Sequence, residues 1–218
     1  MGYFDWGVIE RSWPFLAQGM ALSFLLVIVA TAGGLLLGFG LALMRMSRRT
    51  SVCAVATSYV TVMRSVPLIL VLFWFYFLVP LVIGRPVGSL ASALTAFVLF
   101  EAAFYCEIIR AGIDSVRSGQ TEAGLATGMR RWQTLRLIVM PQAFRAMIPL
   151  LLNQIIIVFQ DTSLVYVVGL HDFMTSASVV ASRDGRPTEI YTLVIVVYLV
   201  ICFSLSKAVQ LYKRAPVR

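Results

Sequence analysis

The sequence has few charged residues and long stretches without any. Only 13% of its 218 residues are charged and 60% are hydrophobic, whereas about a quarter of a soluble domain is charged. Residues 12–44, 65–84, 146–160 and 190–206 contain no Asp, Glu, Lys or Arg. About 20 apolar residues cross a bilayer core as a helix, and none of these runs alternates apolar and polar residues as a barrel strand does. The composition excludes a soluble domain and predicts an all-α integral membrane protein.

The sequence also lacks the residue sets that catalytic and metal sites need. The three cysteines are isolated, no two of them have metal-ligand or redox spacing, and His171 is the only histidine. There is no G-x-x-x-x-G-K-[ST] phosphate loop, and no nucleophile, base and orienting acid are grouped. We therefore expect no catalytic residue, no metal and no cofactor bound by this chain. If the protein performs work, another chain supplies the energy.

The apolar runs and the polar breaks between them predict one transmembrane domain over residues 1–218. Residues 1–13 form a polar and aromatic tail, the segment Arg64–Pro67 forms a bend, and residues 171–188 form an outside loop. A long polar segment, about residues 113–140, interrupts the apolar pattern. Five spans are predicted, at about residues 15–43, 67–83, 88–112, 145–170 and 189–206.

The basic residues fall mostly on one side of these spans. Arg11, Arg85, Arg183 and Arg186 lie on one side, and the other 14 of the 18 basic residues lie on the opposite side. Cytoplasmic loops carry the excess of Lys and Arg, so the N-terminus is predicted outside and the C-terminus inside. The same rule explains the net charge of +8 without a nucleic-acid partner. The cytosolic residues are Arg45, Arg48, Arg49, Arg64, Arg110, Arg117, Arg130, Arg131, Arg136, Arg145, Lys207, Lys213, Arg214 and Arg218.

The cytosolic segment carries an apolar stripe. Leu125, Met129, Trp132 and Leu135 are spaced by four and three residues, which predicts one apolar side of a short helix. Gly124 and Gly128 leave room for a close approach, and Pro141 is expected to fix the start of the next helix. We expect a soluble protein to dock on this stripe.

The third span contains two acidic residues, which are costly inside a membrane. Glu107 can pair with Arg110 three residues later, near the cytosolic end. Glu101 lies deeper and has no partner close to it in the sequence. It is therefore the better candidate for lining a polar path.

The fourth span carries a polar side. Asn153 and Gln160 are seven residues apart, as are Gln154 and Asp161, so all four are predicted on one side of the helix. Such a side faces other helices or a water-filled route. Interhelical hydrogen bonding and a substrate route both fit, and Asp161 can alternatively cap a helix that restarts at Thr162.

The cytosolic segment resembles a known motif. Glu122-Ala123-Gly124, then Gly128, then Ile138 to Pro141 keep the spacing E-A-A-x3-G-x9-I-x-L-P of the EAA loop, with Gly in place of Ala at 124 and Met in place of Leu at 140. This loop marks the membrane subunits of bacterial ATP-binding-cassette (ABC) importers. Residues 107–113, 141–145 and 161–164 resemble the polar amino acid permeases of that class. Residues 100–105 and 159–167 are similar to the glutamate/aspartate importer permeases, and Arg64-Ser-Val-Pro67 departs from the usual R-G-T-P at two positions.

The resemblance implies the type I importer permease fold in the bacterial inner membrane. It implies an EAA coupling helix seated on a cytosolic ATPase subunit that binds the ATP and magnesium. A second permease, identical or related, a periplasmic amino acid binding protein and membrane lipid would be the other partners. The residues assigned to coupling are Glu122, Ala123, Gly124, Leu125, Gly128, Met129, Trp132, Ile138 and Pro141.

A polar amino acid would cross beside Glu101, which suits an ammonium group, and beside Asn153, Gln160 and Asp161. Arg64 and Arg110 are candidates for binding substrate carboxylates or phospholipid near the exit. Two other functions fit the residues less well. A secondary transporter or channel driven by an ion gradient would use Glu101 and Asp161 as ion sites, but the sequence has no internal repeat. A membrane scaffold would tolerate polar substitutions throughout the fourth span.

Overall fold

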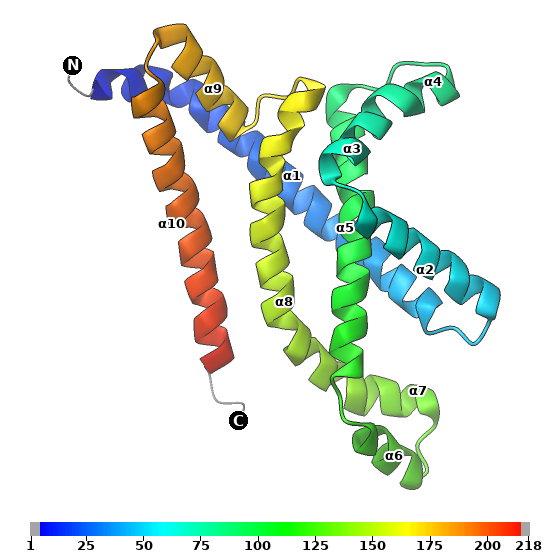
Figure 1. The fold of residues 1–218 in the computed structure, drawn as a ribbon. Coiled ribbons are helices and arrows are strands. Elements are labelled where there is room, and N and C mark those ends of the chain that lie inside the picture. The colour runs from blue at the N-terminus through cyan, green and yellow to red at the C-terminus, as the bar shows by residue number, and fades with distance from the viewer. Residues whose placement is uncertain (1–4, 215–218) are drawn as a thin grey trace.

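The computed structural model describes residues 5–214, which form helices joined by short turns, with no strand in that range (Figure 1). The start of the predicted tail, residues 1–4, and Arg218 lie outside the described residues. The α-helices are α1 (Trp6–Arg45), α2 (Thr50–Ser65), α3 (Leu68–Phe73), α4 (Val79–Ile83), α5 (Ser89–Asp114), α6 (Ser118–Ala126), α7 (Arg131–Thr134), α8 (Met140–Asp161), α9 (Phe173–Asp184) and α10 (Pro187–Arg214). Two π-helical turns, η1 (Trp74–Leu78) and η2 (Leu135–Val139), and a 3₁₀ helix, η3 (Thr162–Val168), lie between them.

The five predicted spans correspond to four single helical stretches and one bent helix pair, which gives five crossings when the pair is counted as one span. Within the described residues, four helical stretches are long and apolar enough to cross: α1, α5, residues 131–168 and α10. The fifth crossing is a bent pair, α2 and the helix over Leu68–Ile83, whose axes differ by 106°. The predicted span at 67–83 therefore covers only the second half of this crossing, since residues 50–65 are helical too.

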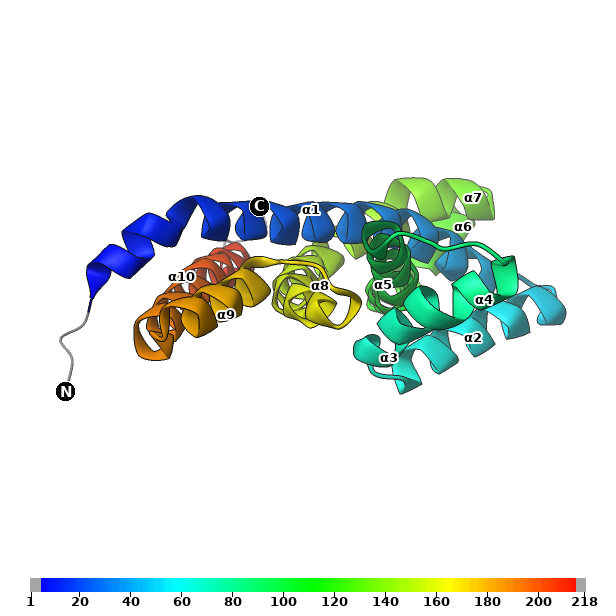
Figure 2. The same cartoon turned by 90° about the horizontal axis from the view of Figure 1, so that it is seen from above.

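Helix α1 is the longest element and runs along one face of the molecule. Its 40 residues extend about 60 Å, twice the thickness of a bilayer core, so it must lie obliquely. Figure 1 shows it crossing behind α8 and α5, and Figure 2 shows the other spans arranged along one side of it. Residues 6–13, predicted as part of a tail, are the first turns of this helix.

Glycines allow α1 to pack closely on α5. A β-carbon on Gly38 would lie 2.8 Å from the carbonyl oxygen of Ala102, and one on Gly34 would lie 3.0 Å from Cβ of Glu101. Small residues permit this approach between membrane helices, as the sequence predicts. Gly40 is different, because a β-carbon there would meet nothing within 4 Å.

Prolines mark the irregular points of the spans. Val66 is extended (φ −114°, ψ 137°) just before Pro67, because the proline ring disfavours a helical conformation there, and this produces the predicted bend. Pro141 lies in the first turn of α8, as predicted, although α8 continues without a break from the π turn before it. The π turn η2 precedes it and widens the helix, so residues 131–161 stay helical although Pro141 has no N–H to donate.

Part of the predicted outside loop, residues 171–188, is helical instead. Asp172 begins α9 by accepting hydrogen bonds from the backbone N–H groups of Met174 (3.1 Å) and Thr175 (3.0 Å). α9 then packs on α1, where a β-carbon on Gly19 would lie 2.5 Å from Oγ of Ser176. The helix has a polar sequence and is held by this contact, which hydropathy does not reveal.

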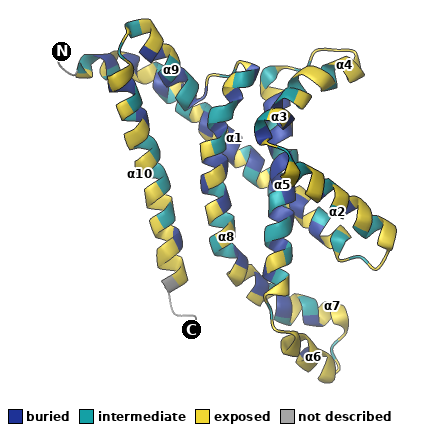
Figure 3. Ribbon diagram, viewed as in Figure 1, coloured by how far each residue is buried: buried dark blue, intermediate teal, exposed yellow. Residues whose placement is uncertain are grey.

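The two ends of the molecule agree with an odd number of crossings. The N-terminal start of α1 lies at the same end as α9 and α4, whereas the end of α10 lies toward the end that carries α6 and α7 (Figure 1). With the charge bias, the α6–α7 end is cytosolic. Buried residues gather where α1, α5 and α8 meet, and α10 is largely exposed (Figure 3).

Candidate functional site

The cytosolic segment folds as two short helices separated by a tight turn. α6 ends in a Schellman motif: the N–H of Met129 donates to the carbonyl of Gly124 (3.2 Å) and the N–H of Gly128 to that of Leu125 (3.0 Å). Gly128 has φ +84°, a left-handed conformation that favours glycine. Gly128 was predicted to leave room for a close approach, but a β-carbon there would meet nothing within 4 Å, and the residue instead forms this turn.

The single apolar stripe predicted on one helix is wrong. Leu125 lies on α6 and Trp132 on α7, with the Gly128 turn between them. Both side chains are exposed, Leu125 by 39% and Trp132 by 65%. Spacing alone does not reveal this break, but the glycine at 128 was the available signal.

Gly124 provides the close contact between α6 and the helix that follows. A β-carbon there would lie 2.7 Å from Cγ2 of Thr134 and 2.9 Å from Cδ1 of Ile138. The close approach expected at Gly124 is therefore made by the chain itself. Glu122 and Ala123 are exposed on α6, and Pro141 is exposed in the first turn of α8.

A buried carboxylate lies between α5 and α8. Glu101 is fully buried, and its Oε2 accepts a hydrogen bond from Nε2 of Gln154 at 2.9 Å. Its other oxygen, Oε1, has no hydrogen-bond partner among the described residues. A buried acceptor without a partner is costly, so Glu101 is an unusual residue at this position.

The four polar residues of the fourth span do not share one environment. Gln154 points into the protein toward Glu101, whereas Asn153 and Gln160 are exposed on the isolated chain and Asp161 is half-buried. Nε2 of Gln160 makes a weak contact with Sγ of Cys202 at 3.7 Å. Asp161 makes no capping hydrogen bond, because α8 continues directly into η3. Sequence reasoning missed Gln154 as the partner of Glu101, since the two are 53 residues apart.

Glu107 is the centre of an ion-pair network near the cytosolic end. The predicted pair with Arg110 is present, with 3.0 Å between Nε and Oε2. Glu107 also contacts Arg45 of α1 and lies 3.6 Å from Arg64 of α2. Three helices are thus tied to one carboxylate, and Arg64 and Arg110 are already paired within the chain.

Comparison with known proteins identifies the family. Residues 34–215 match the family described as binding-protein-dependent transport system inner membrane component. The chain belongs to this family. It is 47% identical to the glutamate/aspartate import permease protein GltK of Escherichia coli O6:H1, covering 97% of both chains. It is 31% identical to the glutamine transport system permease protein GlnP of Escherichia coli K12, covering 93% of both chains.

A solved structure gives the same result for the fold. The protein described as an amino acid ABC transporter with histidines matches with a TM-score of 0.91 and 30% identity, over 99% of this chain and 100% of that one. The permease therefore has the type I ABC importer fold. It is a multi-pass inner-membrane transporter subunit rather than an enzyme, and as a member of this family it works with a binding protein.

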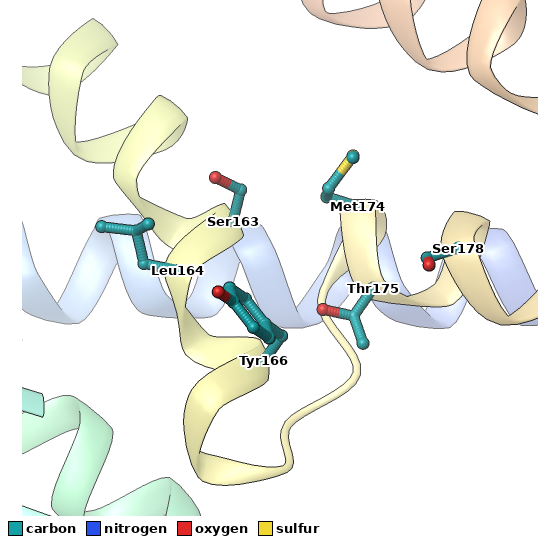
Figure 4. Close-up of a pocket in the computed structure, with 6 residues that line it drawn as sticks. All are labelled: Ser163, Leu164, Tyr166, Met174, Thr175 and Ser178. Atoms are coloured by element: carbon teal, nitrogen blue, oxygen red, sulfur yellow. The ribbon is translucent and has the colours of Figure 1, made fainter. Parts of the chain in front are cut away.

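The permease has a pocket at the end opposite the cytosolic segment. It has a volume of about 390 Å³ and lies between η3 and α9. Figure 4 shows the hydroxyl groups of Ser163, Tyr166, Thr175 and Ser178 around it, with Leu164 and Met174 on its walls. Its size is within the range of small-molecule sites. Ser163, Leu164 and Tyr166 in its lining belong to η3, which directly follows the outer end of α8.

Proposed function

We propose that this permease imports glutamate and aspartate as part of a complex driven by ATP hydrolysis on separate cytosolic subunits. The observation that carries this proposal is the likeness to GltK over 97% of both chains. The buried Glu101 supports it, because its free oxygen suits the ammonium group that every amino acid carries. The chain would bind neither ATP nor magnesium itself.

The route would run along α8. Asn153 and Gln160 are exposed polar residues within a membrane span, and such residues do not face lipid. With Leu150 and Ile157 they form an exposed stripe on α8. A second permease, identical or related, would cover this stripe and enclose a path that passes Asn153, Gln160 and Asp161. Glu101 lies on the α5 side of α8, so it would join the path only when α8 moves relative to α5. The hydroxyl-lined pocket at the outer end would be the entrance facing the periplasmic amino acid binding protein.

Coupling would begin at α6. The exposed Glu122, Ala123 and Leu125, with Met129 beyond the turn, form the surface proposed to sit in a groove of the ATPase. When the ATPase closes, α6 moves, and its contact at Gly124 passes the movement to Thr134 and Ile138. These residues belong to the continuous helix 131–168, which carries Gln154. The ATPase supplies the free energy that shifts the permease between two states.

A competition experiment tests the substrate. Uptake of labelled glutamate is measured in a strain without its own copy of this permease, with and without the chain and its partner subunits. Unlabelled aspartate and glutamate should compete strongly, whereas glutamine and arginine should compete weakly. Strong competition by glutamine or arginine alone would contradict the assignment to acidic amino acids.

A further inference from the structure

An apolar groove lies where the cytosolic segment meets the spans. Phe39 and Leu43 of α1 form one wall, Ile109 of α5 forms another, and Trp132 and Leu135 of the cytosolic segment close it. Its wall surface is apolar, and its volume is small, about 80 Å³. Trp132 therefore faces toward α1, away from the turn that carries Leu125 and Met129.

The position of the groove corresponds to the inner surface of the membrane. Its walls come from the last turns of α1, which ends at Arg45, and of α5, which ends at Asp114. The exposed apolar side chains of α1 lead directly into it: Leu36 is 77% exposed, Phe39 44% and Leu43 46%. This surface is continuous with the exposed apolar side of the span. Tryptophan is enriched at this level because its ring is apolar and its N–H is polar.

A free cation lies at the edge of the groove. Arg136 lines it and is exposed, and it makes no ion pair within the part of the chain that the structure describes. The nearby basic residues of the predicted cytosolic side, Arg130 and Arg131, are exposed as well. A guanidinium beside an apolar groove matches a phosphate joined to an acyl chain.

We propose that this groove binds one anionic phospholipid of the cytoplasmic leaflet. Its phosphate would contact Arg136, its acyl chain would lie against Phe39 and Leu43, and the Trp132 ring would lie at the headgroup level. This lipid site is separate from the amino acid route proposed above. It would anchor the start of helix 131–168 to the membrane surface while α6, on the other side of the Gly128 turn, moves with the ATPase.

Fluorescence of Trp132 provides the test. The chain has four tryptophans, so Trp6→Phe, Trp13→Phe and Trp74→Phe leave Trp132 alone. The assembled complex of this variant is placed in vesicles containing phosphatidylglycerol or phosphatidylcholine, each brominated on its acyl chains. Bromine on the anionic lipid should quench Trp132 more strongly than bromine on the neutral lipid. Adding Arg136→Gln should reduce this preference about fivefold, the factor that corresponds to roughly 1 kcal/mol for one basic residue at an anionic surface.

A matched control uses Leu125, an exposed apolar residue on the other side of the Gly128 turn. With Trp132→Phe and Leu125→Trp, the single tryptophan should not be quenched by either lipid, and ATPase binding should shield it from aqueous acrylamide. The proposal is wrong if neither brominated lipid quenches the fluorescence of Trp132. It is also wrong if ATPase binding shields Trp132 from acrylamide, because the groove would then be a protein contact. Equal quenching by the two lipids would also contradict it. Glutamate uptake by the same variants is scored separately, so that failure of this site is distinguished from failure of the transport proposal.

Discussion

Glu101 is an acid without an adjacent cation in the described structure, and it lies in a membrane-spanning helix. Its one hydrogen bond joins α5 to α8 through Gln154. A carboxylate is expensive in this position, and such residues are kept where they perform a function. The unpartnered Oε1 is the feature that distinguishes this residue from an interhelical contact made only for stability.

Two substitutions separate these roles. Glu101→Gln keeps a hydrogen-bonding group opposite Gln154, so assembly and Tm should be nearly unchanged while glutamate uptake falls by at least about tenfold, the effect of losing one charged contact. Glu101→Leu leaves Gln154 without its partner and should also destabilise the permease by about 1–3 kcal/mol. Uptake assays and thermal unfolding of the purified complex provide both readouts. Normal uptake by the Gln variant would exclude Glu101 from the route.

The ion pairs around Glu107 are expected to stabilise the folded permease. Glu107→Gln leaves Arg45, Arg64 and Arg110 without their shared carboxylate, in a region where Glu107 itself is 19% exposed. The network is only partly buried, so losing the shared carboxylate should cost somewhat more than the roughly 1 kcal/mol of an exposed pair, and Tm should fall. Adding Arg45→Gln removes one of the uncompensated charges and should recover part of the loss. A double-mutant cycle without coupling between positions 45 and 107 would show that the network does not stabilise the fold.

The elements show which features the sequence could predict. The spans were predictable because hydropathy is a local property of about 20 residues. The bend at Arg64–Pro67 was predictable because proline constrains its own φ and the residue before it. α9 was not, because its polar sequence is held by contacts with α1, such as that between Gly19 and Ser176.

The candidate site also contains some features that the sequence could predict and others that it could not. The turn at Gly128 was predictable from the glycine, whereas the pairing of Glu101 with Gln154 depends on how α5 packs against α8. The place of Pro141 in the first turn of α8 was predictable because proline is favoured there. The π turn at Leu135–Val139, through which the helix continues from α7 into α8, is not indicated by the local sequence. The assignment of the coupling and pathway residues stays a prediction.

The turn between α6 and α7 is expected to be needed for coupling to the ATPase, and substitutions at Gly128 test this. Gly128→Val forces a branched side chain into a left-handed conformation at a cost of about 1–2 kcal/mol, which should displace α6 relative to α7. We expect loss of uptake and weaker co-purification of the ATPase, with membrane insertion intact. Gly128→Asn is the matched control, since asparagine tolerates this conformation better and should retain most of the activity. Equal activity of both variants would argue against the turn as a coupling element.

The whole molecule is an incomplete transporter. One of its faces is covered by α1, α10 is exposed along its apolar length, and α8 presents exposed polar residues. Its cytosolic segment presents exposed residues on α6, and the chain has no phosphate-binding loop. These features are complementary to a second permease and to an ATPase, as expected of the family to which it belongs.

Reconstitution tests the central claim most directly. The permease, its partner permease and the ATPase are placed in liposomes, and uptake of labelled glutamate is measured with the binding protein outside and ATP inside. We predict uptake that requires both ATP and the binding protein and that persists when an ionophore collapses the ion gradients. Uptake by this chain alone that is abolished by the ionophore would contradict the account.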